Sequence, residues 1–298
     1  MKRIFALNIL IPIVILTAMI SAGAGLFWQG GNGPFAFTSL HGKSVQMYGQ
    51  GIYQFDTHFR APIFRGTDAV TLFVAVPLLI FAFFLYRKYS LRGTFFLVGV
   101  LAYLLYNSAS MSLGVAYNPL FLVYIIFFSA SFFSFILAYF SIDSEILPAH
   151  IAQTYPRRGV AIFLFCAGLS VFVWLSEILA PLFQGVYPAG LDSYTTEITY
   201  VIDLGIIPPV CYLTGFLVLR RSPQGYLLSA LMIILNAFIG LVVISQTVFQ
   251  YLAGIVLDPG QYIGFVGTFV LMGSVAIRII YLVMRNISQE EIPLTPFS

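Results

Sequence analysis

Charged residues are scarce in this sequence. Of its 298 residues only 8% are charged and 60% are hydrophobic, whereas soluble domains carry roughly 25% charged residues. A chain of this composition cannot cover itself with polar surface, so most of its apolar side chains are expected to face lipid. The net charge of +3 is small and scattered along the chain, which argues against a nucleic-acid partner.

The residue types that several membrane chemistries need are missing from the apolar stretches. The two cysteines, Cys166 and Cys211, lie far apart and in no zinc-ligand or C-x-x-C spacing. No histidine or lysine falls inside an apolar stretch of spanning length, which argues against a haem held by two histidines and excludes a retinal Schiff base. No Walker A or H-E-x-x-H pattern occurs. We therefore expect no cofactor and no metal ion in the membrane, and the sequence identifies no catalytic residue.

Eight apolar stretches have the length of about 20 residues that crosses a bilayer. Because backbone groups in lipid must bond to one another, each stretch is expected to be a helix. The predicted fold class is therefore all-α, a polytopic integral membrane helix bundle with eight transmembrane helices. The stretches are 5–27, 68–86, 93–114, 119–141, 159–182, 198–219, 225–251 and 261–284.

The first stretch has a second interpretation. Two basic residues, an apolar run and the small residues 21–25 are also typical of a secretory signal peptide, whose cleavage would leave seven spans. We favour retention because the apolar run continues through residues 26–28 to spanning length.

Lysine and arginine predict the orientation, because they are enriched in cytoplasmic connections. With both termini in the cytoplasm and the chain in the plasma (inner) membrane, only Lys43, Arg60 and Arg65 of the fourteen basic residues lie outside. The remaining eleven are Lys2, Arg3, Arg87, Lys88, Arg92, Arg157, Arg158, Arg220, Arg221, Arg278 and Arg285.

The predicted organisation is a single transmembrane domain over residues 1–298 with one sizeable extracytoplasmic loop over residues 28–67. The loop holds His41, Asp56 and His58, which include a D-x-H spacing that metals can use. We favour a different role for it, as a lid over polar residues in the membrane, because glycines mark its turns.

Residues 1–141 and 159–285 are predicted to be two repeats. In each, an aspartate near the start of one span, Asp68 or Asp203, is followed by a proline and then by a pair of basic residues before a glycine. Since each repeat would hold four spans, the two would run in the same direction, related by an axis along the membrane normal. Features common to all span ends could also produce this likeness.

Polar side chains within the spans are the candidates for function, because they are costly to place in lipid. With the predicted orientation they gather in the outer half of the bundle, and several pairs share a helix face at spacings of three or four residues. The candidate substrate-binding residues are Glu177, Asp203, Asn107, Gln246, Tyr103, Tyr200 and Trp174.

These polar residues also have structural interpretations. Asp68, at the predicted start of its span, is expected to cap free amide groups. Asn107 and Gln246 are interpreted first as hydrogen-bond partners between helices. For Asp203 and Glu177 a structural and a functional role stay equally open, and the two prolines after Asp203 predict a kink or break there.

Three functions are consistent with this pattern. The favoured hypothesis is binding, and transport, of a small cation or polar solute with Glu177 and Asp203 as charged ligands. An alternative is an outer-leaflet enzyme in which these carboxylates act as acid and base on a lipid-linked substrate. A third is a non-catalytic membrane partner or sensor. The lipid bilayer is the expected environment, and the sequence points to no particular protein partner.

Overall fold

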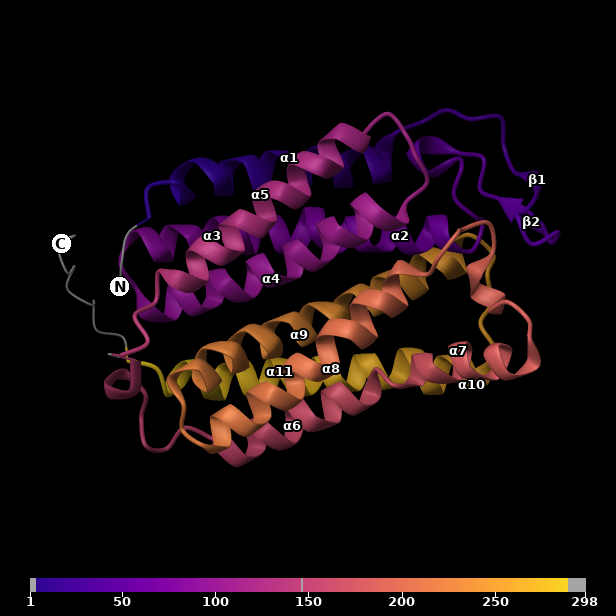
Figure 1. The fold of residues 1–298 in the computed structure, drawn as a ribbon. Helices are drawn as coiled ribbons and strands as arrows, with labels where there is room; N and C mark the ends of the chain where they lie inside the picture. The colour runs from indigo at the N-terminus through magenta and orange to yellow at the C-terminus, as the bar shows by residue number, and fades with distance from the viewer. Residues whose placement is uncertain (1–3, 146, 289–298) are drawn as a thin grey trace.

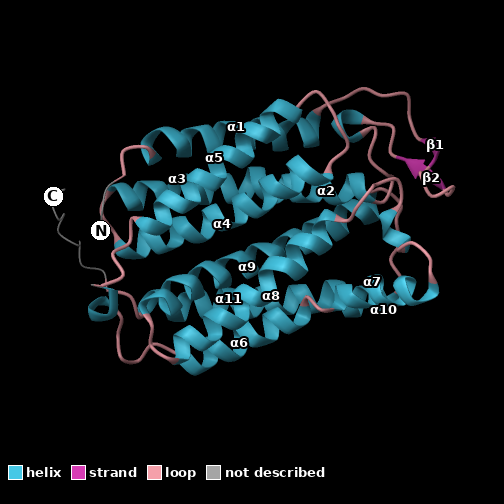
Figure 2. Ribbon diagram, in the orientation of Figure 1, coloured by secondary structure: helices cyan, strands magenta, loops and turns pink. Residues whose placement is uncertain are grey.

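The structure, a computed structural model, describes residues 4–145 and 147–288 as a bundle of long helices (Figures 1 and 2). Within this described part, eight helical stretches are long and apolar enough to cross a membrane, which confirms a helical, multi-pass membrane architecture. Their bounds agree with the sequence prediction to within two residues, except that the second stretch begins at Arg60 and not at residue 68. The number of crossings and the fate of the first span stay predictions.

The helices divide into two groups that form two layers in Figure 1. Residues 4–145, the N-terminal half, form one layer, and residues 147–288, the C-terminal half, form the other. The helices of the N-terminal half are α1 (Leu7–Phe27), α2 (Arg60–Val70), α3 (Val76–Arg87), α4 (Leu91–Gly114) and α5 (Phe121–Phe140). Those of the C-terminal half are α6 (Arg157–Ser170), α7 (Val173–Gln184), α8 (Ile198–Leu219), α9 (Pro223–Leu252), α10 (Pro259–Gln261) and α11 (Thr268–Arg285).

The two halves meet along α4 and α9, which are the most buried of the long helices. α2 also packs against α9, and α8 packs against α4. Small residues permit close approach at this interface: Gly66 of α2 lies against the backbone of Gln246 in α9, so a β-carbon would not fit there. The contacts between the halves are therefore made chiefly by α2, α4, α8 and α9.

Proline affects two of the spans differently. Between α2 and α3 the chain forms a short π-helical segment, Thr71–Ala75, which ends two residues before Pro77. The ring and missing N–H of a proline are poorly tolerated inside a regular helix. In contrast, α8 continues from Ile198 to Leu219 through Pro208 and Pro209. Of the kink or break expected beside Asp203, the break is therefore absent, because the two prolines are accommodated within one continuous helix; the kink stays a prediction.

The segment between α1 and α2 folds over one end of the bundle, here named the loop end. Its strands β1 (Phe35–Thr38) and β2 (Ser44–Met47) pair antiparallel, and a 3₁₀ turn, η1 (Gly51–Tyr53), follows. Gly49 has a φ of 71° and lies against the backbone of Gly33, where only glycine fits. Because α2 begins at Arg60, the segment is shorter than the predicted loop, 28–67.

At the opposite end of the bundle the two halves are also bonded to each other. Arg92, at the start of α4, donates from Nε to the carbonyl of Ile287 over 2.7 Å. Tyr139 of α5 donates from its hydroxyl to Oε1 of Gln224 in α9 over 2.5 Å. The halves are therefore joined by polar contacts at this end as well as at the loop end.

Candidate functional site

Asp203 is a buried carboxylate of α8 that bonds to both halves of the bundle. The Tyr106 hydroxyl of α4 donates to its Oδ1 over 2.8 Å, and the Trp174 indole of α7 donates from Nε1 to its Oδ2 over 3.0 Å. Only 8% of Asp203 is exposed. Within the described part of the chain Asp203 forms no ion pair, so both oxygens are held by neutral donors.

Aromatic rings surround the indole that bonds to Asp203. Trp174 stacks on Tyr200 of α8 and on Phe265, with ring centroids 5.2 Å apart in both cases. Phe269 of α11 lies 6.2 Å from the same ring. The structure thus brings together three predicted site residues, Asp203, Trp174 and Tyr200, at the side of the C-terminal half that faces α4.

Tyr103 and Asn107 form a second group, in the N-terminal half. The Tyr103 hydroxyl lies 3.1 Å from Oγ1 of Thr71, the first residue of the π-helical segment, and Asn107 donates from Nδ2 to the same atom over 3.0 Å. The Tyr103 ring stacks on Phe238 of α9 at 4.3 Å. Since π-helical segments commonly occur at functional sites, Thr71 joins the candidate residues.

Asp68 is not a helix cap, which corrects the sequence interpretation. The helix begins at Arg60, so Asp68 lies in its third turn, where amide groups are already bonded. Its side chain is 1% exposed and its Oδ2 accepts a hydrogen bond of 2.6 Å from the Tyr53 hydroxyl, which reaches down from η1. The long loop therefore contributes a phenol to a buried carboxylate; its role as a movable lid stays a prediction.

Gln246 and Glu177, the remaining predicted site residues, have different surroundings. Gln246 donates from Nε2 to Oγ1 of Thr67 over 2.9 Å, between α9 and α2. Like Asn107, it is therefore an interhelical hydrogen-bond donor, in agreement with its structural interpretation. Glu177 is half-buried and forms no hydrogen bond or ion pair within residues 4–145 and 147–288, although it lies within electrostatic range of Tyr200. No hydrogen bond joins Glu177 to Asp203 there.

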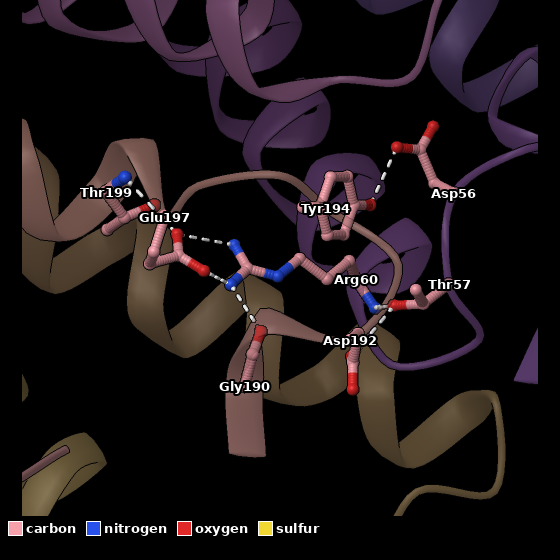
Figure 3. A network of polar contacts seen from close by, with 8 residues as sticks. All are labelled: Asp56, Thr57, Arg60, Gly190, Asp192, Tyr194, Glu197 and Thr199. Carbon is pink, nitrogen blue, oxygen red and sulfur yellow. Dashed lines mark hydrogen bonds and ion pairs between the residues drawn. The ribbon is translucent and has the colours of Figure 1, made fainter. Parts of the chain in front are cut away.

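A network of polar side chains closes the loop end between the halves (Figure 3). Arg60 of α2 forms an ion pair with Glu197, which precedes α8, and its Nη2 donates to the carbonyl of Gly190 over 3.2 Å. The guanidinium lies between these two acceptors, and the Tyr194 ring lies beside it at 5.3 Å (Figure 3). Local sequence patterns do not reveal this pairing, because the partners are distant in the chain.

Asp56 links three segments in the same network. Its Oδ1 accepts hydrogen bonds from the Ala116 backbone N–H over 2.9 Å and from the Tyr194 hydroxyl over 2.8 Å. Its Oδ2 is buried without a hydrogen-bond partner in the described part of the structure. Burial raises the pKa of Asp56 from its ordinary value of 3.8 to about 6, although both hydrogen bonds and Arg60 oppose the shift.

A cavity of about 590 Å³ lies beside Asp56, between the β-hairpin and the residues before α8. Phe35 and Phe37 of β1 and Leu113 of α4 supply apolar walls, and Tyr194 and Ala116, the two donors to Asp56, supply part of the rest. This cavity lies at the junction of the two halves.

The histidines of the loop do not gather into a metal site. Within the part of the chain that the structure describes, no three histidine, cysteine or acidic side chains are placed to hold a metal ion. His41 stacks on Tyr187 at 3.8 Å, while Asp56 is bonded to Ala116 and Tyr194. The D-x-H spacing therefore has a structural explanation in the docking of the loop.

Comparison of the chain with protein-family models, with curated proteins and with solved structures gave no match. The function is therefore argued from the geometry of the site.

Proposed function

We propose that this protein binds a small cation, or a small solute that carries a positive charge, between its two halves and moves it across the membrane. The observation that supports this proposal is the environment of Asp203. A carboxylate inside a membrane span is costly unless a positive charge or a proton accompanies it. Asp203 has two neutral donors and no basic partner within the described residues, so a cation is the chemical complement it lacks.

The location of the candidate residues also supports transport. Asp203 and Tyr106 bond across the two halves, and so do Gln246 and Thr67. In transporters built from repeated halves, the substrate site lies between the repeats near the middle of the membrane. The stacked rings of Trp174, Tyr200 and Phe265 add aromatic surface next to the carboxylate, and such surface attracts cations.

We further infer that the halves are parallel repeats, as proposed for residues 1–141 and 159–285. The turns between the second and third spans of each half are alike in detail. Tyr89 and Arg221 both have a φ of 58°, although neither is glycine, and each is followed by the serine at the start of the next helix. Two residues of one sequence thus occupy the same rare backbone conformation at the same place in each half.

Residues around these two turns correspond in pairs, and the difference between the two residue numbers is the same in every pair. Gly93 packs against Leu85 and Gly225 packs against Leu217, and in both turns a β-carbon on the glycine would overlap its neighbour. Pro77 and Pro209 are separated by this same offset. In this register Asp203 corresponds to Thr71 and not, as the sequence comparison of the halves assumed, to Asp68. The carboxylate of one half therefore takes the position of the hydroxyl that bonds Tyr103 and Asn107 in the other.

The experiment uses the full chain in proteoliposomes, with Na⁺, K⁺, protons and the organic cation methylammonium as probes. The expected result is flux of at least one probe, and its loss in Asp203→Asn, because the neutral amide no longer attracts a cation. Glu145→Gln is the matched control, since Glu145 is exposed and its side chain forms no hydrogen bond within the described residues.

The folded state of each variant is checked by its melting temperature and by gel filtration. Unchanged flux in folded Asp203→Asn, or no flux of any probe with the unaltered protein, contradicts the proposal.

A role as a non-catalytic membrane partner is the second candidate, and the two amides favour it. Asn107 and Gln246 each bond a threonine on a neighbouring helix, as expected of residues that hold helices together. The lipid-linked enzyme hypothesis requires two carboxyls roughly 5 to 9 Å apart, and it stays a prediction. Purification of the chain always with another membrane subunit, and without flux, favours the partner role.

A further inference from the structure

A second cavity, of about 350 Å³, lies at the loop end where the long loop meets α2 and the last turn of α9. Its polar wall consists of Arg65, His58, Tyr48 and Gln50. Its apolar wall includes Phe249 and Leu252 of α9. None of the residues of the proposed transport site lines it, so it is a separate site.

Arg65 brings a positive charge to this cavity. Its Nη1 donates to the Tyr48 hydroxyl over 2.9 Å and its Nη2 donates to the carbonyl of Leu26 over 3.3 Å. Its guanidinium lies 5.5 Å from the centre of the Phe249 ring. Asp68 is within electrostatic range but bonds Tyr53, and Arg65 forms no ion pair within the described residues. An anion is therefore the complement that this guanidinium lacks.

His58 provides a second polar group without a partner. Its Nδ1 is buried and has no hydrogen-bond partner in the described part of the structure, while its backbone N–H bonds the carbonyl of Gln46 over 2.8 Å. A buried imidazole nitrogen without a partner is costly and is usually bonded in native proteins. His58 lines the cavity, and an imidazole N–H donates hydrogen bonds that phosphate oxygens accept.

The apolar wall indicates that the anion belongs to an amphiphile. Leu252 is 73% exposed and Tyr251, next to it, is 65% exposed, at the end of the longest apolar helix. In a membrane these side chains face acyl chains near the boundary with the headgroups. The cavity thus places a guanidinium and an imidazole at headgroup depth, beside a surface that contacts lipid tails.

We propose that this cavity binds the phosphate of a phospholipid in the leaflet at the loop end. Arg65, with His58, contacts the phosphate oxygens, and Phe249 and Leu252 pack against the start of an acyl chain. Arginine suits this role because its planar fork matches phosphate oxygens and keeps its charge. The bound lipid would join the loop to the ends of α2 and α9.

The experiment measures lipid binding to the purified full chain by native mass spectrometry. The probes are phosphatidylglycerol, which is anionic, phosphatidylcholine, which is zwitterionic, and inorganic phosphate. The expected result is one tightly retained phosphatidylglycerol, with an apparent affinity that falls about tenfold or more in Arg65→Gln, the usual effect of losing a hydrogen bond to a charged group. Lys43→Gln, which removes an exposed positive charge from the same end of the bundle, is expected to change little.

Ala253→Phe is a second variant that leaves the charge of Arg65 in place and fills the cavity. It is expected to lose the lipid while remaining folded, which keeps the test informative if Arg65→Gln does not fold. Equal retention of phosphatidylglycerol by all variants overturns the proposal. Competition by inorganic phosphate without retention of any lipid also overturns it, because the site then takes free anions.

Discussion

The guanidinium of Arg60 and the carboxylate of Glu197 form an ion pair that joins the N-terminal half of the bundle to the C-terminal half at the loop end (Figure 3). The two side chains are 17% and 9% exposed, so the pair is largely shielded from water. Glu197 also accepts a hydrogen bond from the Thr199 backbone N–H at the start of α8, over 3.3 Å. This pair therefore fixes the start of one transmembrane helix relative to that of another.

Breaking the pair on one side is expected to destabilise the protein more than removing both charges. Arg60→Gln leaves the Glu197 carboxylate shielded and unpaired, which costs about 3 kcal/mol. The double variant Arg60→Gln with Glu197→Gln leaves no unpaired charge and should recover part of this loss. Melting temperatures of the single and double variants in detergent measure the coupling. A double variant no more stable than Arg60→Gln alone would argue against it.

Stability should depend on the protonation of Asp56. Its pKa is raised from 3.8 to about 6 in the folded protein, so the folded state binds the proton more tightly than the unfolded chain. The stabilisation from this proton is fully present below pH 3.8 and is lost as the pH rises through about 6, a change of about 3 kcal/mol. Asp56→Asn should remove this dependence. The melting temperatures of the unaltered protein and of Asp56→Asn are measured across this pH range. A difference between them that does not change with pH contradicts the raised pKa of Asp56.

Much of the fold could be predicted from the sequence, because hydropathy alone sets the lengths of membrane helices. The start of α2 was missed for a physical reason: residues 60–67 include two arginines, which lower the hydropathy of this stretch, yet Arg60 bonds Gly190 and Thr67 bonds Gln246 of α9. This error also led to the wrong role for Asp68. A hydropathy profile finds long apolar stretches, and it misses a helical turn whose arginines are bonded within the protein.

The candidate site was predictable where its residues share a helix face, and not where they pair across the chain. Tyr106 is one turn from Tyr103 in α4, so the same periodicity that identified Tyr103 and Asn107 includes it. In contrast, Tyr53 bonds Asp68 from a loop turn, and Arg60 bonds Glu197 from the other half. Such pairings follow from the tertiary arrangement, which a single sequence does not specify.

The contact between α1 and the buried Asp68 depends on Gly25. A β-carbon at this position would overlap the Asp68 carboxyl and lie against the Tyr53 hydroxyl. Gly25→Ala should therefore destabilise the protein by about 1 to 3 kcal/mol, as overpacking does. Gly23 is the matched control in the same helix, because nothing lies within 4 Å of its β-carbon position. Gly23→Ala should be neutral or slightly stabilising, since alanine favours helix. Equal melting temperatures of the two variants would contradict this account.

The orientation of the protein in the membrane decides from which side a cation reaches its site and in which leaflet the lipid site lies. The distribution of basic residues predicts that the loop end lies outside and the opposite end in the cytoplasm. Single introduced cysteines test this orientation in a background that carries Cys166→Ser and Cys211→Ala. One variant adds Ser44→Cys at the loop end, and the other adds Glu145→Cys at the opposite end; both native side chains are exposed. In intact spheroplasts a membrane-impermeant maleimide should label Ser44→Cys and leave Glu145→Cys unlabelled. After permeabilisation both should react, which shows that both thiols are accessible. The reverse pattern would place Arg65 and its cavity in the cytoplasmic leaflet and would reverse the side from which a cation reaches Asp203.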